Sequence, residues 1–180
     1  DRCKQILMLK KWVGAFDSKV NGQSPINLTT KQSVLLNRNL SKKAITVLKN
    51  LNNIVPLTNL GSLKLAYLST GPDKGDIFYN RLNHYMPIKK YIYSSESAIN
   101  DEIDILKELT NYDVVIVGVH HHNNNFWEKH EMSEKDSLFL SKVFNQNKTI
   151  LNIFGHPKLL NSIDSRNVNS IILSYQNTAC

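Results

Sequence analysis

The residues best suited to chemistry follow an apolar run near the middle of the chain. The run Val114 to Val119 is followed directly by a polar segment, His120-His121-His122-Asn123-Asn124-Asn125-Phe126-Trp127-Glu128. Asn and His offer hydrogen-bond donors and acceptors, and aromatic rings offer flat apolar faces, a mixture that suits the hydroxyl rim and apolar face of a sugar ring. A plain polar surface loop with two aromatic side chains folded onto a sheet fits the same pattern. The candidate sugar-binding residues here are His120, His122, Asn123, Asn124, Asn125, Trp127 and Glu128.

Three adjacent histidines also suggest a metal ion. Consecutive residues that leave a strand point in alternating directions, so at most His120 and His122 share a side. No Cys, Asp or Glu stands at a recognisable ligand spacing, and Cys3 and Cys180 lie at opposite ends of the chain. The sequence therefore predicts neither a metal site nor a bound cofactor.

A second polar loop, Ser69 to Gly75, follows an earlier apolar run and contains Asp73. Ser69-Thr70-Gly71 is similar to a flavodoxin phosphate loop, in which backbone amides at a helix start hold the anion. Pro72 removes one amide, however, and Asp73 puts a negative charge where a phosphate would lie. A glycine-containing turn at the end of a buried strand explains the segment equally well, and Asp73 joins the candidate sugar-binding residues.

Covalent catalysis has little support in the sequence. No G-x-S-x-G elbow is present. The carboxylates Glu128, Glu131 and Glu134 lie in or near the His/Asn segment and could act as general acid or base, although such residues more often are solvated or cap a following helix. We therefore name no catalytic residue.

The elements that must position these loops alternate between strands and helices. Apolar runs predict five strands, at 63–68, 88–93, 114–119, 149–154 and 170–174, and helices are expected at 76–84, 97–109, 133–145 and 157–163. Earlier in the chain, a short helix is expected at 2–13 and a long one at 31–50, with a linker between them. Ser133 with Asp136 is typical of a capping box, and Pro157 of a first helical turn.

Strands that alternate with helices predict a three-layer α/β/α sandwich around a mainly parallel, flavodoxin-like sheet of five strands in the order 2-1-3-4-5. In such a sheet ligands bind beyond the carboxyl ends of the strands, where the strand order reverses. The loops that begin at Ser69 and His120 meet at that point.

Composition excludes several classes of protein. The chain has 180 residues, of which 41% are hydrophobic and 21% charged, as in ordinary globular domains. A net charge of +7 invites a nucleic-acid interpretation, but the lysines are spread thinly and no basic stripe interleaved with aromatics exists. No stretch of about 18 apolar residues is present, so no membrane partner is expected. The ends at Asp1 and Cys180 suggest a piece cut from a longer protein.

Several segments resemble a known family. Lys43-Ala44-Ile45-Thr46-Val47-Leu48-Lys49-Asn50, followed by Asn53-Ile54-Val55-Pro56-Leu57, resembles the helix-and-turn signature that enters the second domain of family 3 glycoside hydrolases. The strand that begins after Tyr112 and the later ones at 150–157 and 171–177 are similar to further strands of that domain. The resemblance covers nearly the whole chain, and the Lys-Asn…Val-Pro-Leu region is its most specific part.

The resemblance implies that residues 1–30 end an inter-domain helix and linker, and that 31–180 form the carboxyl-side α/β domain. It implies a partner barrel domain that carries the aspartate nucleophile, a carbohydrate substrate, and retaining hydrolysis. The β-glucosidase-like members place a glutamate in the loop after the third strand. This chain has His121-His122-Asn123-Asn124-Asn125 there, with no glutamate. The resemblance then favours the bacterial β-N-acetylglucosaminidase type, a role in carbohydrate metabolism or peptidoglycan recycling, and a periplasmic or cell-envelope parent.

The fragment alone is then expected to be inactive and to shape one wall of a sugar cleft. A free-standing flavodoxin-like domain that binds a nucleotide or flavin remains an alternative, as does a purely structural interaction module.

Overall fold

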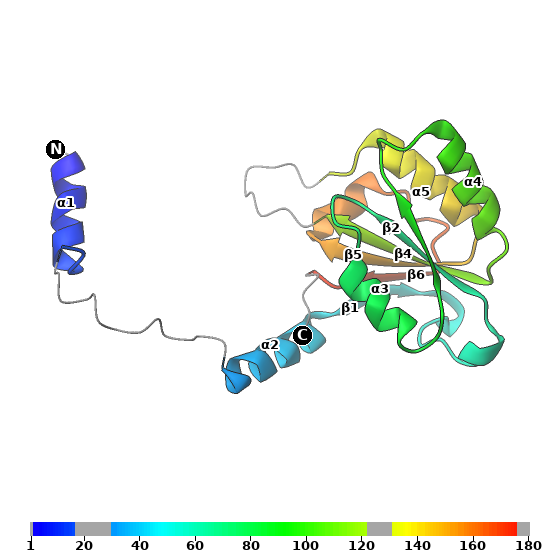
Figure 1. Ribbon diagram of the computed structural model, residues 1–180, viewed down its shortest axis with the longest axis horizontal. Coiled ribbons are helices and arrows are strands. Elements are labelled where there is room, and N and C mark those ends of the chain that lie inside the picture. The colour runs from blue at the N-terminus through cyan, green and yellow to red at the C-terminus, as the bar shows by residue number, and fades with distance from the viewer. Residues whose placement is uncertain (1, 17–29, 122–130, 176–180) are drawn as a thin grey trace. The chain divides into compact units, whose positions relative to one another are not determined.

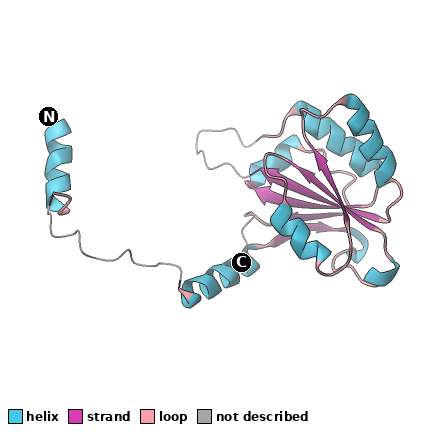
Figure 2. Cartoon of the chain, viewed as in Figure 1, coloured by secondary structure: helices cyan, strands magenta, loops and turns pink. Residues whose placement is uncertain are grey.

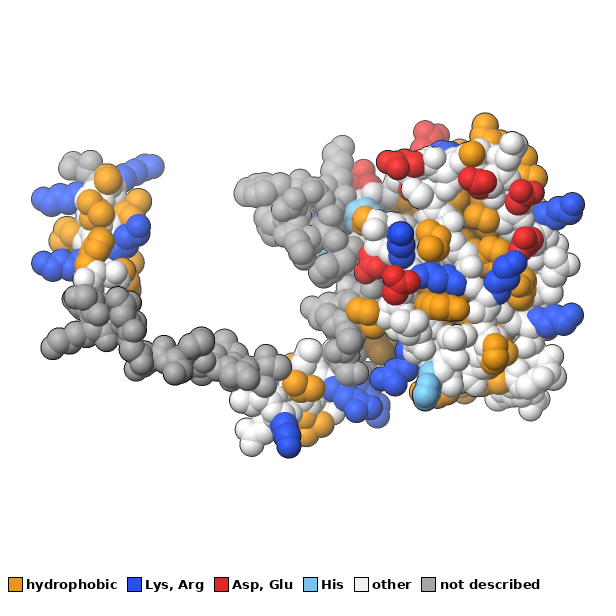
Figure 3. Space-filling model, in the orientation of Figure 1, with side chains coloured by type: hydrophobic (Ala, Val, Ile, Leu, Met, Phe, Trp, Pro, Cys, Tyr) orange, Lys and Arg blue, Asp and Glu red, His pale blue; other side chains and the backbone are white. Residues whose placement is uncertain are grey.

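The chain divides into two compact units, residues 1–36 and 37–180. The computed structural model describes residues 2–16, 30–121 and 131–175 (Figure 1). In the first unit, α1 (Arg2–Trp12) buries no residue, and its hydrophobic side chains are interspersed with Lys and Arg (Figure 3). The helix α2 (Lys31–Ala44) begins in the first unit and ends in the second. The expected domain division after residue 30 stays a prediction.

The described part of the second unit contains one sheet of six strands (Figure 2). Its order is β1-β6-β5-β4-β2-β3, in which β1 pairs antiparallel with β6 and every other neighbouring pair is parallel. The five parallel strands follow the predicted 2-1-3-4-5 order, so the fold prediction is confirmed, with one additional strand. The strands are β1 (Thr46–Asn50), β2 (Leu65–Thr70), β3 (Lys89–Tyr93), β4 (Val114–His121), β5 (Thr149–Gly155) and β6 (Ser170–Leu173).

The additional strand corrects the sequence prediction of a helix over 31–50. The helix α2 ends at Ala44, and residues 46–50 form β1. Leu51 continues the contact, because its amide donates to the Asn169 carbonyl at 2.8 Å. The Asn50 side chain then accepts from the Val55 amide at 3.0 Å and donates to the Val55 carbonyl at 2.7 Å, which fixes the turn that leads away from the strand.

Helices cover both faces of the parallel strands (Figure 1). One face packs against α3 (Asp76–Asn83), and the other against α4 (Ile99–Leu109), α5 (Glu134–Gln146) and the 3-10 helix η4 (Pro157–Ser162). Two more 3-10 turns, η2 (Leu51–Asn53) and η3 (Leu60–Ser62), connect β1 to β2. Ser133 caps α5 as predicted, since its hydroxyl accepts from the Asp136 amide at 3.1 Å.

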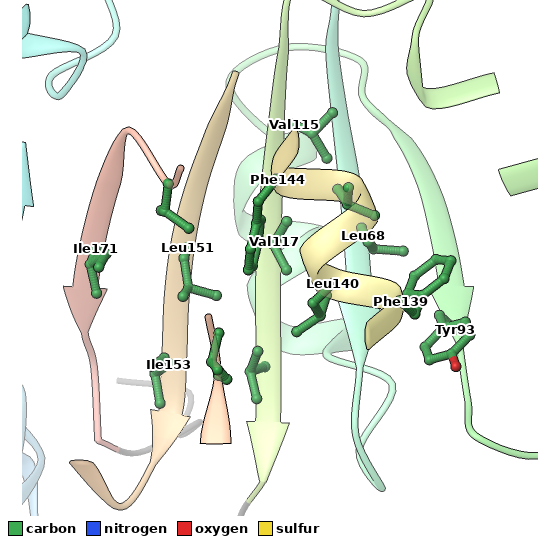
Figure 4. Close-up of a cluster of buried hydrophobic side chains, with 14 of the residues drawn as sticks. Leu68, Tyr93, Val115, Val117, Phe139, Leu140, Phe144, Leu151, Ile153 and Ile171 are labelled. Atoms are coloured by element: carbon green, nitrogen blue, oxygen red, sulfur yellow. The ribbon is translucent and has the colours of Figure 1, made fainter. Parts of the chain in front are cut away.

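The larger core lies between the sheet and α5 (Figure 4). In the register of the sheet, Val117 stands between Leu68 and Leu151, and all three are fully buried. The ring of Phe139 from α5 stacks on that of Tyr93 from β3, with centroids 3.7 Å apart. A fully buried aliphatic or aromatic side chain contributes about 1.5–3 kcal/mol, so this layer holds the strand ends in fixed positions.

Candidate functional site

The strand order reverses at β2, which has β3 on one side and β4 on the other. The connection after β2 crosses one face of the sheet, and the connection after β3 crosses the opposite face. The two connections therefore diverge beyond the carboxyl ends of these strands and leave a crevice, the usual ligand position in open parallel sheets.

A cavity of about 410 Å³ lies at this edge, and we call it the edge cavity. Ligand sites commonly have volumes of about 300–1,000 Å³, so it can hold a small molecule. The ends of β2 and β4 contribute Thr70 and His121, and Ser94 follows β3. The segment that leads into α5 contributes Glu131, and α5 itself contributes Asp136.

Strand alternation decides which histidine reaches the edge cavity. His121 lies on the same face as Val119 and Val117, toward α5, and it lines the cavity. Its Nδ1 atom is buried and has no hydrogen-bond partner among the described residues. His120 lies on the opposite face, toward α3.

Two further polar residues line the edge cavity. Thr70 at the end of β2 is only 2% exposed. The Oδ1 atom of Asp136 is buried without a described partner, although the amide of that residue is used for capping. Buried polar groups are nearly always hydrogen-bonded, so this oxygen indicates a place for an external donor.

The lining of the edge cavity is acidic. Glu96, Glu131 and Asp136 line it, and no Lys or Arg does within the described ranges. Lys135 is nearby but already bound, because its ammonium group donates to the Ser95 carbonyl at 2.8 Å and lies 3.1 Å from the Glu102 carboxylate.

His120 forms a buried pair with Tyr67 on the α3 side of the sheet. The Tyr67 hydroxyl and His120 Nε2 lie 2.5 Å apart, and both side chains are fully buried. The imidazole stacks on Phe154 with centroids 4.5 Å apart. Burial lowers the pKa of His120 to about 4 and raises the pKa of Tyr67, so both groups are neutral near pH 7.

Glycines allow the loop after β2 to lie against this pair. Gly71 and Gly75 both have positive φ angles, 109° and 65°. A Cβ atom on Gly71 would overlap the His120 backbone carbonyl, and one on Gly75 would overlap His120 Nε2. Only glycine permits this approach without strain, so the loop closes over the histidine.

Asp73 is exposed in the same loop, and its carboxylate accepts a hydrogen bond from the Gly75 amide at 2.9 Å. That amide stands at the start of α3, where a flavodoxin-like loop would bind phosphate. The chain's own carboxylate takes up the position, so the structure gives no support to the nucleotide or flavin alternative.

Of the predicted binding residues, Asp73 lies in the loop after β2 and His120 lies beneath that loop. Neither lines the edge cavity. The other candidates, His122, Asn123, Asn124, Asn125, Trp127 and Glu128, lie outside the described residues. Thr70, His121 and Asp136 were not among the candidates. The alternation of side chains along the strand could have indicated His121. Asp136 was instead interpreted as a helix-capping residue.

The described residues contain no group of three or more His, Cys, Asp or Glu side chains arranged to hold a metal ion. None of the described helices is both long and apolar enough to cross a membrane.

Solved structures of family 3 glycoside hydrolases share this fold. A β-N-acetylglucosaminidase of the family from a Paenibacillus species matches 98% of this chain with a TM-score of 0.69 at 15% identity. A fungal multi-domain β-N-acetylglucosaminidase of the family matches 82% with a TM-score of 0.62 at 17% identity. A β-glucoside phosphorylase matches 83% with a TM-score of 0.55 at 17% identity.

This chain spans 34%, 16% and 28% of those three proteins respectively, so it corresponds to one region of much longer chains. No protein-family model matches the sequence, and no curated protein is significantly similar to it. The likeness of fold that the sequence predicted is confirmed.

Proposed function

We propose that this chain is the accessory carboxyl-side α/β domain of a family 3 glycoside hydrolase, of the β-N-acetylglucosaminidase or β-glucosidase-like type. In this role it shapes one wall of the sugar-binding cleft and packs on a catalytic barrel domain. The observation that carries the proposal is the polar edge cavity, which lies at the reversal of strand order in a fold shared with those enzymes.

The edge cavity has the chemistry that a sugar needs. The Thr70 hydroxyl, the Asp136 carboxylate and the His121 imidazole can each exchange hydrogen bonds with sugar hydroxyls. Thr70 and Asp136 are held by a buried strand end and by a capped helix, so their positions are set before a ligand arrives. A rigid polar site of this kind loses little entropy on binding.

An exposed apolar edge supports packing on a second domain. Ile45, Val47, Leu48 and Leu51 at and around β1 are 48–51% exposed. β1 forms one edge of the sheet, and no residue of that strand is fully buried. An apolar sheet edge invites non-specific pairing unless it is covered, and a barrel domain of the same protein would cover it.

The chemistry of hydrolysis is assigned to that barrel domain. Retaining hydrolysis needs a nucleophile and an acid/base about 5 Å apart, and in the resemblance noted above the nucleophile belongs to the barrel. We expect the isolated chain to release no chromophore from a chromogenic N-acetylglucosaminide. Turnover by the pure chain would contradict the accessory role.

Sugar binding is tested by titrating N-acetylglucosamine into the isotope-labelled chain and following its amide NMR signals. The signals of Thr70, Ser94 and Asp136 should shift together and saturate at millimolar sugar. Thr70→Val keeps the shape of the side chain but removes the hydroxyl, so it should weaken binding about threefold or more.

The matched control is Thr149→Val, because Thr149 is another buried strand threonine but lies at the amino end of β5. It should leave the sugar titration unchanged. Shifts that gather at the amino ends of the strands, or no saturable shifts with any sugar, would rule out the proposal.

A further inference from the structure

The loop after β2 is shared by the edge cavity and the buried His120. The end of β2 and the start of this loop line the cavity, through Thr70, Gly71 and Pro72. The two glycines of the loop lie against His120, because a Cβ atom on Gly71 would overlap its backbone carbonyl and one on Gly75 would overlap its ring. One wall of the cavity therefore rests on an ionisable side chain.

The closed loop accommodates His120 only in its neutral form. Its Nε2 atom lies 2.5 Å from the hydroxyl of Tyr67, whose ring stacks on that of Tyr79 from α3. Its Nδ1 atom is buried and has no hydrogen-bond partner among the described residues. A protonated imidazole carries N–H on both nitrogens, so protonation would put a charge and an unpaired donor where solvent does not reach, and both are costly.

The charged groups around His120 do not offset this cost. Burial lowers the pKa of His120 to about 4, although Asp73 in the loop and Asp76 in α3 raise the pKa, and Lys90 of β3 lowers it further. Asp76 is moreover paired with Lys90 at 2.5 Å. On the side of β5, the imidazole stacks on Phe154, which carries no charge.

From this geometry we propose that the loop after β2 is an acid-sensitive wall of the edge cavity: protonation of His120 releases the loop, and its release weakens sugar binding. Water reaches the ring once the loop has moved, so the charged imidazole is stable only in the open form. The effect on sugar rests on the proposed function, whereas the release of the loop is a property of the chain without any ligand.

The size of the effect follows from the two states of His120. The pKa of its ring is about 4 with the loop closed, and an imidazole in water has a pKa of about 6.5. Between these values the open form binds more protons than the closed form. The ratio of open to closed loops should therefore rise about thirtyfold when the pH is lowered from 7.5 to 5.

Amide hydrogen exchange of the full chain, followed by NMR at a series of pH values and corrected for the intrinsic exchange rate, tests the release of the loop. The Gly75 amide, which donates to Asp73, reports on the loop, and the Val117 amide reports on unfolding of the sheet. We expect Gly75 to be less protected than Val117 at every pH, with protection that falls about thirtyfold from pH 7.5 to 5. Equal protection of the two amides, or protection of Gly75 that does not change with pH, would overturn the proposal.

Two histidine variants separate this effect from other titrations. His120→Gln has no ring to protonate, so the protection of Gly75 should no longer depend on pH. His84→Gln, at an exposed histidine, is the matched control and should keep the full dependence. The comparison of Gly75 with Val117 needs no variant, so it decides the matter if His120→Gln does not fold. A His120→Gln protein that keeps the thirtyfold fall would overturn the proposal.

The effect on the cavity is measured with N-acetylglucosamine, titrated at pH 7.5 and at pH 5. Its affinity should fall about twofold or more at pH 5, by the same factor as the fraction of closed loops that hydrogen exchange gives. His120→Gln should remove this fall. A fall of equal size in His120→Gln, or none in the unaltered chain, overturns this inference and leaves the proposed function standing. Absence of sugar binding at both pH values counts against the proposed function, whatever the loop does.

Discussion

The Tyr67 hydroxyl and the Nε2 atom of His120 meet at 2.5 Å in a space that solvent does not reach. The two residues come from adjacent strands, β2, where the strand order reverses, and its neighbour β4. Their pair lies on the α3 side of the sheet, and Gly71 and Gly75 of the loop after β2 rest on it. The pair therefore links the stability of the core to the position of the cavity's loop.

Removal of the tyrosine hydroxyl should destabilise the protein. Tyr67→Phe leaves His120 Nε2 buried without a partner, and the expected loss is about 1–3 kcal/mol in the free energy of unfolding. Urea denaturation followed by circular dichroism measures it. Tyr85→Phe, at a residue 71% exposed, is the control and should change the free energy by less than about 0.5 kcal/mol. Equal stabilities of the two variants would show that the pair contributes nothing.

Acid should weaken the fold through His120. Its pKa is about 4 in the folded chain because of burial, against about 6.5 in the unfolded chain. Between these values the unfolded state binds more protons, so stability falls as the pH is lowered from about 6.5 to 4, by on the order of 3 kcal/mol. Denaturation midpoints at a series of pH values measure the slope. His120→Gln should flatten it, and His84→Gln, at an exposed histidine, should not.

The close approach of the loop to His120 makes one glycine irreplaceable. In Gly71→Ala the new Cβ would lie 2.8 Å from the His120 carbonyl carbon, at a φ of 109°. We expect a loss of about 2 kcal/mol or more in stability and displaced amide NMR signals around the edge cavity. Gly61→Ala is the matched control, because no atom lies within 4 Å of its added Cβ. A Gly71→Ala protein as stable as Gly61→Ala would show that the loop does not rest on the strand.

The apolar edge at β1 should tolerate charge, unlike the core. Leu48 is 51% exposed and stands where the register of β1 with β6 shifts, so Leu48→Lys should change stability by about 0.5 kcal/mol or less. Leu151→Ala, at a fully buried residue, should cost about 2–5 kcal/mol. Binding of a hydrophobic dye such as ANS to the folded chain should fall in Leu48→Lys. Strong destabilisation by Leu48→Lys would mean that this edge is already covered.

The parallel sheet was predictable because each of its strands is a short apolar run in the sequence. Val114 to Val117 is continuously apolar, as expected of a strand buried on both faces, and polar helix starts such as Ser133 separate the runs. The edge strand β1 was missed because Ala44, Ile45 and Leu48 also fit a helical period. Its pairing with Ile171 and its neighbours in β6 lies more than a hundred residues away in sequence, where no local pattern reports it.

The candidate site was predictable only in its location. Strand order pointed to the carboxyl edge of the sheet, where the edge cavity lies, but the His/Asn segment was favoured over ordinary residues such as Thr70. Whether a side chain faces the edge cavity or the core depends on where the strand ends. β4 continues through His121, which turns His120 inward beside Tyr67. In the sequence Asp136 fits a capping residue equally well. That its Oδ1 atom has no described hydrogen-bond partner is known only from the structure.

The most direct test of the central claim is a crystal structure of the chain grown with N-acetylglucosamine. We predict that the sugar lies in the edge cavity, with its hydroxyls near the Thr70 side chain and the Asp136 carboxylate. A sugar bound at the amino ends of the strands, or on the α3 face beside Tyr67, would contradict it.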